Sequence, residues 1–369
     1  MLIRRQAIRR RSAANSATHL LLGRPPDRNS PGNFQVPDKP AGGSVRPVSR
    51  TRVRPFAAGD VAAAGALLAQ RHARHRVSRP LLSAQYEDLT AATAEVAAAF
   101  GTAGASGVFA VRDGEPVGYL LGFPKPGKLW GPNVWVESAG HAASDGETLR
   151  DLYAVAAAGW VASGLTAHYV LVPATDEELV RAWFRLGFGQ QACHGLRGVP
   201  AQAPARTTGL TIRRTVREDI PALAALDVEL LRYQSLAPVF SAAPVPPVAE
   251  AAGEWAEGFD DPEYTTFVAE QDGTVAGAAV GCALEKSGSH TGLARPDNAG
   301  FLGFAAVFPS ARGHGAGRAL GEAVLQWAAQ AGFGCVVIDW RATNLLSSRT
   351  WPALGFAESF LRLHRLIGY

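Results

Sequence analysis

Residues 312–317 have the residue types and spacing with the clearest chemical meaning in this sequence. They read Arg-Gly-His-Gly-Ala-Gly, an Arg-x-x-Gly-x-Gly pattern between the apolar run "GFLGFAAVF" and a helical pattern that continues to Gln330. Glycine in an ordered element costs conformational entropy, so three glycines within five residues need a reason. A glycine-rich turn that opens a helix offers free backbone N–H groups to an anion, and the helix dipole strengthens the attraction. The pattern therefore predicts a phosphate-binding loop.

Other binding motifs fit the chain poorly. A GxGxxG motif fails because its last glycine would fall on Arg318 or Leu320, and no Gly-Lys-Ser/Thr follows as in a P-loop. Cys193, Cys282 and Cys335 are far apart and have no Cys/His metal spacing, so we expect free thiols and no metal site. No apolar run reaches the ~18–20 residues that span a bilayer, and we expect a cytoplasmic protein without membrane contact.

The residues around the loop predict an alternating α/β unit over 209–369. We expect strands at 210–216, 264–271, 274–285, 300–308, 335–342 and 358–367, and helices at 218–233, 246–259, 315–330 and within 344–356. The Asp272-Gly273 pair between two apolar runs is typical of a hairpin turn.

An earlier segment of the chain repeats this order. Asp113-Gly114 precedes Asp272-Gly273 by 159 residues, and Asp60 precedes Asp219 by the same distance. Farther on, Trp183 corresponds to Trp351. We therefore predict two copies of one unit, at 51–198 and 209–369, joined by a Pro/Ala-rich linker at 199–208. These copies are called the first and second repeat below.

The second repeat resembles the GNAT (Gcn5-related N-acetyltransferase) superfamily. The resemblance rests on the Arg312–Gly317 loop, on the strand "FAAV" before it, and on the Asn-led segment "NLLSSRTWPALGF" that ends in Gly-Phe. It implies an α/β (α+β) fold with two tandem copies, each a mixed, mostly antiparallel sheet flanked by helices.

The resemblance also implies the binding of acetyl-CoA or another acyl-CoA, with no metal. The pyrophosphate would be held by Arg312, Gly313, His314, Gly315, Ala316, Gly317 and Arg318. The pantetheine arm would be held by Ala305, Ala306, Val307 and Asn344, and Asn344 is also suited to cap its helix. A splay or bulge of the strand before the loop would make room for that arm.

Catalytic residues are less well defined by the sequence. The position of the tyrosine that many relatives use as an acid is Trp351 here, and the strand before the loop has no ionisable residue. Candidates for proton transfer are Glu285, Asp339 and Ser348, besides His290 and a water chain to bulk solvent.

The first repeat lacks the loop. Its equivalent stretch, "SAGHAAS", has neither the arginine nor the later glycines, and Asp145 and Glu147 follow it. Carboxylates at the start of a helix interact with the positive end of the helix dipole, which would otherwise attract phosphate. We expect this copy to bind no CoA in the family manner and instead to pack against the second.

The basic charge belongs to the N-terminal tail. Residues 1–50 contain nine Arg and one Lys against Asp27 and Asp38, a charge of +8, whereas the whole chain carries +4. The Pro, Gly and Ser content of this segment predicts disorder. The segment could be an extension without function, a transit peptide, or an arm that binds nucleic acid or a membrane surface.

These features are compatible with three functions. The first is an N-acetyltransferase acting in the second repeat on a primary amine of a small molecule or a protein N-terminus, as a monomer or homodimer. The second is a non-catalytic acyl-CoA sensor, and the third an interaction module directed to nucleic acid by the tail, which the intact loop disfavours.

Overall fold

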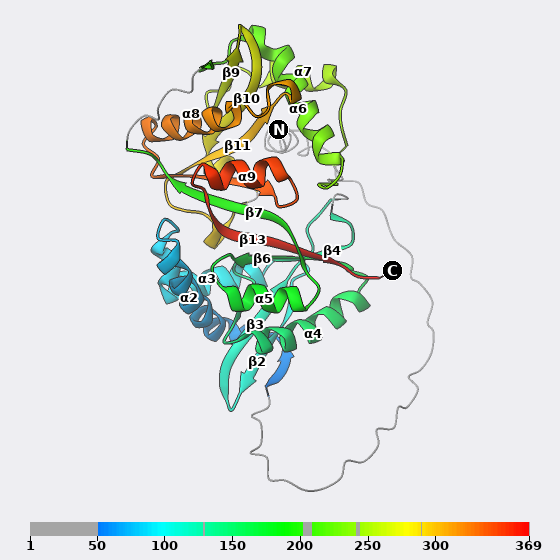
Figure 1. Ribbon diagram of the computed structural model, residues 1–369. Coiled ribbons are helices and arrows are strands. Elements are labelled where there is room, and N and C mark those ends of the chain that lie inside the picture. Colours follow the sequence, from blue (N-terminus) through cyan, green and yellow to red (C-terminus); the bar gives the residue numbers. More distant parts are fainter. Residues whose placement is uncertain (1–50, 128–129, 202–208, 241–243, 289, 369) are drawn as a thin grey trace.

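The computed structural model describes residues 51–127, 130–201, 209–240, 244–288 and 290–368. The predicted tail, 1–50, and most of the predicted linker, 199–208, lie outside these ranges. Both repeats form a sheet–helix body, and the two bodies meet at strands β7 and β13 (Figure 1).

The first repeat contains four longer helices and seven strands within its described residues. In chain order they are β1 (Arg52–Pro55), α2 (Val61–Ser78), α3 (Leu89–Phe100), β2 (Ser106–Arg112), β3 (Glu115–Gly122), β4 (Asn133–Val136), β5 (His141–Ala143), α4 (Gly146–Ala162), β6 (Ala167–Pro173), α5 (Glu177–Arg185) and β7 (Gly189–Gly198).

The second repeat follows the predicted order of elements. They are β8 (Thr211–Arg214), α6 (Ile220–Ser235), α7 (Val248–Glu257), β9 (Tyr264–Gln271), β10 (Thr274–Ala283), β11 (Ala299–Val307), α8 (Ala316–Gln330), β12 (Cys335–Arg341), α9 (Leu345–Ala353) and β13 (Ala357–Leu366). The α/β class with mixed, mostly antiparallel sheets is thus confirmed.

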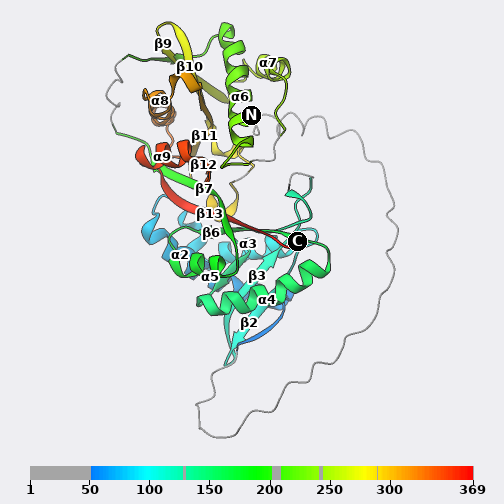
Figure 2. The same cartoon turned by 45° about the vertical axis from the view of Figure 1, so that its right-hand side comes forward.

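The larger of two sheets combines strands of both repeats, which the sequence did not predict. A four-stranded sheet has the order β1-β2-β3-β5, and a nine-stranded sheet has the order β4-β6-β13-β7-β12-β11-β10-β9-β8. The last strand of each repeat is therefore inserted into the other: β7 lies between β12 and β13, and β13 lies between β6 and β7. Figure 2 shows β7 and β13 side by side from a second direction.

Alternating strand residues place helices on both faces of each sheet. In the second repeat, Val268 and Ala278 pack with α6 and α7, whereas their neighbours Ala269 and Ala279 pack with α8. This alternation follows from the two-residue period of a strand. It leaves α6 and α8 on opposite faces of the sheet that carries the predicted loop.

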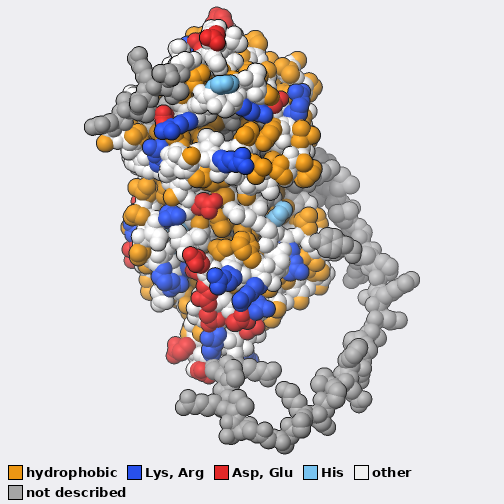
Figure 3. All heavy atoms as spheres, viewed as in Figure 1, with side chains coloured by type: hydrophobic (Ala, Val, Ile, Leu, Met, Phe, Trp, Pro, Cys, Tyr) orange, Lys and Arg blue, Asp and Glu red, His pale blue; other side chains and the backbone are white. Residues whose placement is uncertain are grey.

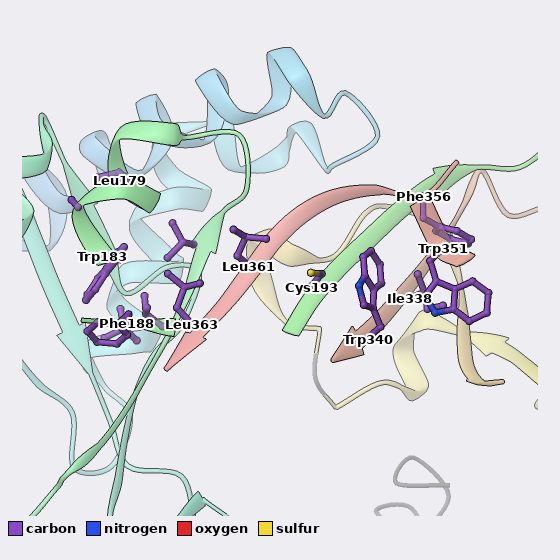
Figure 4. Packing of buried hydrophobic residues seen from close by; sticks show 14 of the residues in the cluster. Leu179, Trp183, Phe188, Cys193, Ile338, Trp340, Trp351, Phe356, Leu361 and Leu363 are labelled. Carbon is purple, nitrogen blue, oxygen red and sulfur yellow. The ribbon is translucent and has the colours of Figure 1, made fainter. Parts of the chain in front are cut away.

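One apolar core runs through both repeats. Figure 4 shows Trp183 and Phe188 of the first repeat in the same cluster as Trp340 and Trp351 of the second, with Cys193 and Leu361 on the exchanged strands between them. The exchange therefore buries side chains of each repeat against the other.

The surface shows mixed charge. On the face in Figure 3, blue Lys and Arg side chains lie among red Asp and Glu side chains over the first repeat. Within the described ranges, no helix combines the length and apolarity needed to cross a membrane.

Candidate functional site

The predicted phosphate-binding loop joins β11 to α8 and leaves the start of that helix uncapped. Gly313 and Gly315 have φ of 85° and 87°, a left-handed conformation that glycine adopts without strain. Gly315 is the N-cap of α8 and supplies no side chain to the first turn. The first N–H groups of the helix therefore face outward, as an anion site requires.

Two neighbouring strands separate next to this loop. β11 and β12 are paired in parallel from Ala299 and Cys335 only to Leu302 and Ile338. Beyond that point β11 keeps only its pairing with β10, and β12 continues beside β7. One edge of β11 is thus left without a strand partner in the described chain, and its backbone groups are available to an extended ligand.

The loop and the open edge of β11 line one pocket of about 410 Å³. Every cofactor-binding residue expected from the sequence lines this pocket except His314, which is exposed. The expected residues that do so are Ala305, Ala306, Val307, Arg312, Gly313, Gly315, Ala316, Gly317, Arg318 and Asn344. The side chain of Asn344 also accepts a hydrogen bond from the Ser347 N–H at 3.2 Å and so caps α9.

Helix α6 holds the arginine of the loop from the opposite side of the pocket. Arg312 forms an ion pair with Glu229 at 3.1 Å, and its guanidinium lies 4.9 Å from the ring centre of Tyr233. Its Nε donates to the Val307 carbonyl at 3.3 Å. The guanidinium is therefore positioned at the loop before any ligand arrives, and a bound anion would compete with Glu229 for it.

A second pocket, of about 220 Å³, continues from the first through the separated strands. Both pockets are lined by Leu230, Ala305, Asn344, Ser347 and Trp351. The second pocket adds charged side chains from three elements: Asp227 of α6, Asp339 and Arg341 of β12, and Arg362 of β13. Together the two pockets can place two molecules in contact through the sheet.

The structure separates the predicted catalytic residues. Asp339 lines the second pocket. Glu285 is exposed, lies outside both pockets and forms an ion pair with Arg295 at 3.4 Å. The Ser348 hydroxyl donates to the Ala342 carbonyl at 2.8 Å and lines neither pocket, whereas its neighbour Ser347 lines both.

Trp351 and His290, which the sequence also singles out, are both buried. Trp351 is buried and forms part of the wall between the pockets. His290 is fully buried outside both pockets, where burial lowers its pKa to about 4.

Sequence reasoning missed Asp227, Arg341 and Arg362 as site residues. For Asp227 the sequence contains a signal, since this residue occupies an apolar position in the α6 pattern after Leu223 and Leu226. In the structure Asp227 is only 2% exposed. The sequence contains no such signal for the two arginines, because they become neighbours only through strand exchange.

The corresponding helix of the first repeat is capped by carboxylates. Asp145 is the N-cap of α4 and accepts a hydrogen bond from the Thr148 N–H at 2.7 Å, and Glu178 accepts one from the Gly146 N–H at 2.8 Å. Burial alone would raise the pKa of Asp145, but the Thr148 bond and Arg112 lower it to about 2. The groups that would bind a phosphate are already occupied by negative charge.

The stretch that the sequence equates with the loop contains a strand instead. Its residues His141–Ala143 form β5, and Ala143 pairs with Gly118 as Val307 pairs with Gly277, so β5 corresponds to the end of β11 and the loop is missing. The position that corresponds to the N-cap Gly315 is Asp145. Ala142 of this strand is buried.

The model of the acetyltransferase (GNAT) family matches residues 231–356. These residues form a GNAT-family domain. The GNAT domain contains β11, the loop, α8, β12 and α9, and it ends at Phe356 of the predicted Gly-Phe signature.

Solved structures extend the likeness beyond the GNAT domain. A GCN5-related N-acetyltransferase from Sphaerobacter thermophilus is 16% identical, with 86% of this chain and 97% of that chain covered and a TM-score of 0.50. A tandem GNAT protein from the clavulanic acid biosynthesis pathway is also 16% identical, with 87% and 99% covered and a TM-score of 0.43. The first likeness supports a shared GNAT fold through both repeats. No curated protein matches the sequence.

Proposed function

We propose that the second repeat binds acetyl-CoA, or another acyl-CoA, and transfers its acyl group directly to a primary amine of a small molecule or protein N-terminus. The observation that carries the proposal is the uncapped start of α8 beside the open edge of β11, within one pocket. The loop N–H groups and Arg312 would bind the pyrophosphate, and the edge of β11 would bind the pantetheine arm by backbone hydrogen bonds.

The transfer requires a nucleophilic amine and an acid for the departing thiolate. Asp339, alone or through water, would take a proton from the substrate ammonium. The free amine then attacks the thioester carbonyl, whose oxygen is polarised by the β11 backbone; the C–N bond forms and the C–S bond breaks. As the amide forms, the nitrogen loses its second proton, and a water molecule oriented by Ser347 would pass that proton to the thiolate. Holding both reactants in the joined pockets supplies much of the acceleration.

A thiol-release assay tests this activity. Acetyl-CoA is incubated with the protein and a panel of small amines and peptides, and free CoA is measured. We expect amine-dependent release that is lost in Arg312→Gln at limiting acetyl-CoA. Tight acetyl-CoA binding without release by any amine would instead support the non-catalytic sensor, which the buried Trp351 in place of an acid favours.

A further inference from the structure

Two arginines line the pocket on the acceptor side of the separated strands. Arg341 lies at the end of β12, and Arg362, only 8% exposed, lies on β13. Neither side chain forms an ion pair with any acidic residue in the described ranges. Most other half-buried arginines have partners: Arg213, for example, binds Asp219 at 2.7 Å and Glu270 at 2.6 Å.

Strand exchange aligns these arginines. Ala192 of β7 pairs with Arg341 on one side and with Arg362 on the other. Side chains of directly paired residues project from the same face of a sheet, and neighbouring strands lie about 4.8 Å apart. The two guanidinium groups therefore begin from backbone positions roughly 10 Å apart and can reach one group between them.

Their donors remain largely available. Arg362 donates from Nε to the Gln191 side chain at 2.8 Å, and its guanidinium lies over the Trp130 ring at 5.6 Å. Arg341 makes no side-chain hydrogen bond within the described part of the chain, although Asp339 attracts it electrostatically. Burial lowers the pKa of Arg341 and lowers that of Arg362 to about 10, which leaves Arg362 a cation at neutral pH.

Carboxylates occupy the other end of the same pocket. Asp339 precedes Arg341 by two residues on the same strand face and directly follows Ile338, where β11 and β12 separate. Asp227 reaches the pocket from α6. The pocket thus has a negative end beside the opening to the CoA pocket and a positive end beyond it.

We propose that the acceptor is a small amine that also carries an anionic group, a carboxylate or a phosphate. This inference rests on the proposed function. The ammonium group lies at Asp339, next to the thioester, and the anionic group lies between Arg341 and Arg362. Arginine suits this role because its planar donors match a carboxylate or phosphate in two-point contact. A volume of about 220 Å³ favours a metabolite of amino-acid size over a protein terminus.

The proposal also gives the first repeat a role at the site. It contributes Trp130, which lines the pocket, and β7, whose Ala192 and Gln191 align and hold the arginines. A repeat without its own CoA site would thus be retained to complete the acceptor pocket.

Matched ligands test the inference. The panel contains the common amino acids, their decarboxylated amines, and the set of serine, ethanolamine and phosphoethanolamine. Thiol release is measured in the full chain, and binding to the CoA-loaded protein is followed by the fluorescence of Trp130, Trp340 and Trp351, which line the pocket. The variants are Arg341→Gln, Arg341→Lys and Arg362→Gln, with the exposed Arg185→Gln as control.

We expect one or more amines with an anionic group to bind and react, and their decarboxylated or dephosphorylated counterparts to be at least roughly 10-fold poorer. Arg341→Gln should weaken the anionic amine roughly 10- to 100-fold and spare the counterpart, with partial rescue by lysine. Serine against phosphoethanolamine then separates carboxylate from phosphate. Equal or better use of amines without the anion would overturn the inference and leave the acetyltransferase standing.

Two further outcomes are decisive. If anionic amines cause neither a fluorescence change in the CoA-loaded protein nor thiol release, the inference is overturned. If they bind but Arg341→Gln and Arg362→Gln bind equally well, the arginines are not the anion site. Failure to bind acetyl-CoA at all would refute the proposed function itself.

Discussion

At the scale of residues, Asp339 is the proposed proton acceptor. It lies beside the point where β11 and β12 separate, and it lines the acceptor pocket. Glu285, an equally plausible residue on sequence grounds, faces solvent with Arg295. Position relative to the separated strands, which is a tertiary property, distinguishes the two.

Asp339→Asn should therefore reduce kcat by about 10²- to 10⁴-fold, the usual contribution of a positioned base. Affinity for acetyl-CoA should stay unchanged, because the first pocket does not include this residue. Steady-state kinetics and calorimetry measure the two quantities. Glu285→Gln is the comparison and should retain wild-type kcat; the reverse ranking would show that proton transfer does not occur at β12.

At the scale of elements, two helices with the same place in the repeat differ at their first turn. α8 begins at a glycine, and α4 begins at Asp145 with Glu178 on its next N–H group. The first N–H groups of the helix are thus open to an anion in the second repeat, whereas in the first repeat they already bind side-chain carboxylates.

Asp145→Ala should lower the free energy of unfolding by about 1–2 kcal/mol, because the cap of α4 and the ion pair with Arg112 are lost. Chemical denaturation measures this cost. The number of acetyl-CoA molecules bound per chain should not change. A variant that unfolds at the wild-type denaturant concentration would show that the cap contributes nothing.

The sequence predicted these elements well where the signal is local. The Gly313 and Gly315 turn, the Asp-Gly hairpins and the order of elements around them all follow from neighbouring residues. The pairing of β7 with β12 and β13, in contrast, selects partners among strands that are similar in composition and far apart in the chain. No local pattern specifies it, and Arg341, Ala192 and Arg362 become neighbours only through it.

At the scale of the whole molecule, the exchanged strands make the repeats depend on each other. Each repeat supplies the strand that completes the other's part of the nine-stranded sheet. We propose that neither 51–198 nor 209–369 folds stably alone.

Cleavage within the predicted linker tests this dependence. With a protease site inserted at 202–208, the two fragments should co-elute in size-exclusion chromatography after cutting, since β7 and β13 remain paired with each other and with their neighbours. Each fragment expressed alone should be insoluble or unfolded by circular dichroism. Two separately folded monomeric fragments would refute the proposal.

Buried histidines make the stability of the molecule depend on pH. Burial lowers the pKa of His72 and His290 to about 4, and that of His75 and His141 to about 3. In the unfolded chain these groups titrate near 6.5, so the unfolded state gains protons first as the pH falls. Their contribution is complete above about pH 6.5 and is lost progressively below it.

Between pH 7 and pH 5 each of these histidines should cost about 2 kcal/mol of stability, and the melting temperature should fall accordingly. Calorimetric scans at several pH values check this. An unchanged melting temperature over that interval would mean that the rings are protonated in the folded protein.

The most direct test of the CoA site in the second repeat is calorimetric titration of acetyl-CoA into the full chain and into Gly315→Glu. The control is Gly332→Glu, which also replaces an exposed glycine with positive φ, at the far end of α8 and outside the pocket. We predict one site per chain in the wild type and in Gly332→Glu, and none in Gly315→Glu, where a carboxylate enters the anion site. Unchanged affinity in Gly315→Glu, or two sites per chain, would contradict the assignment of a single CoA site to the second repeat.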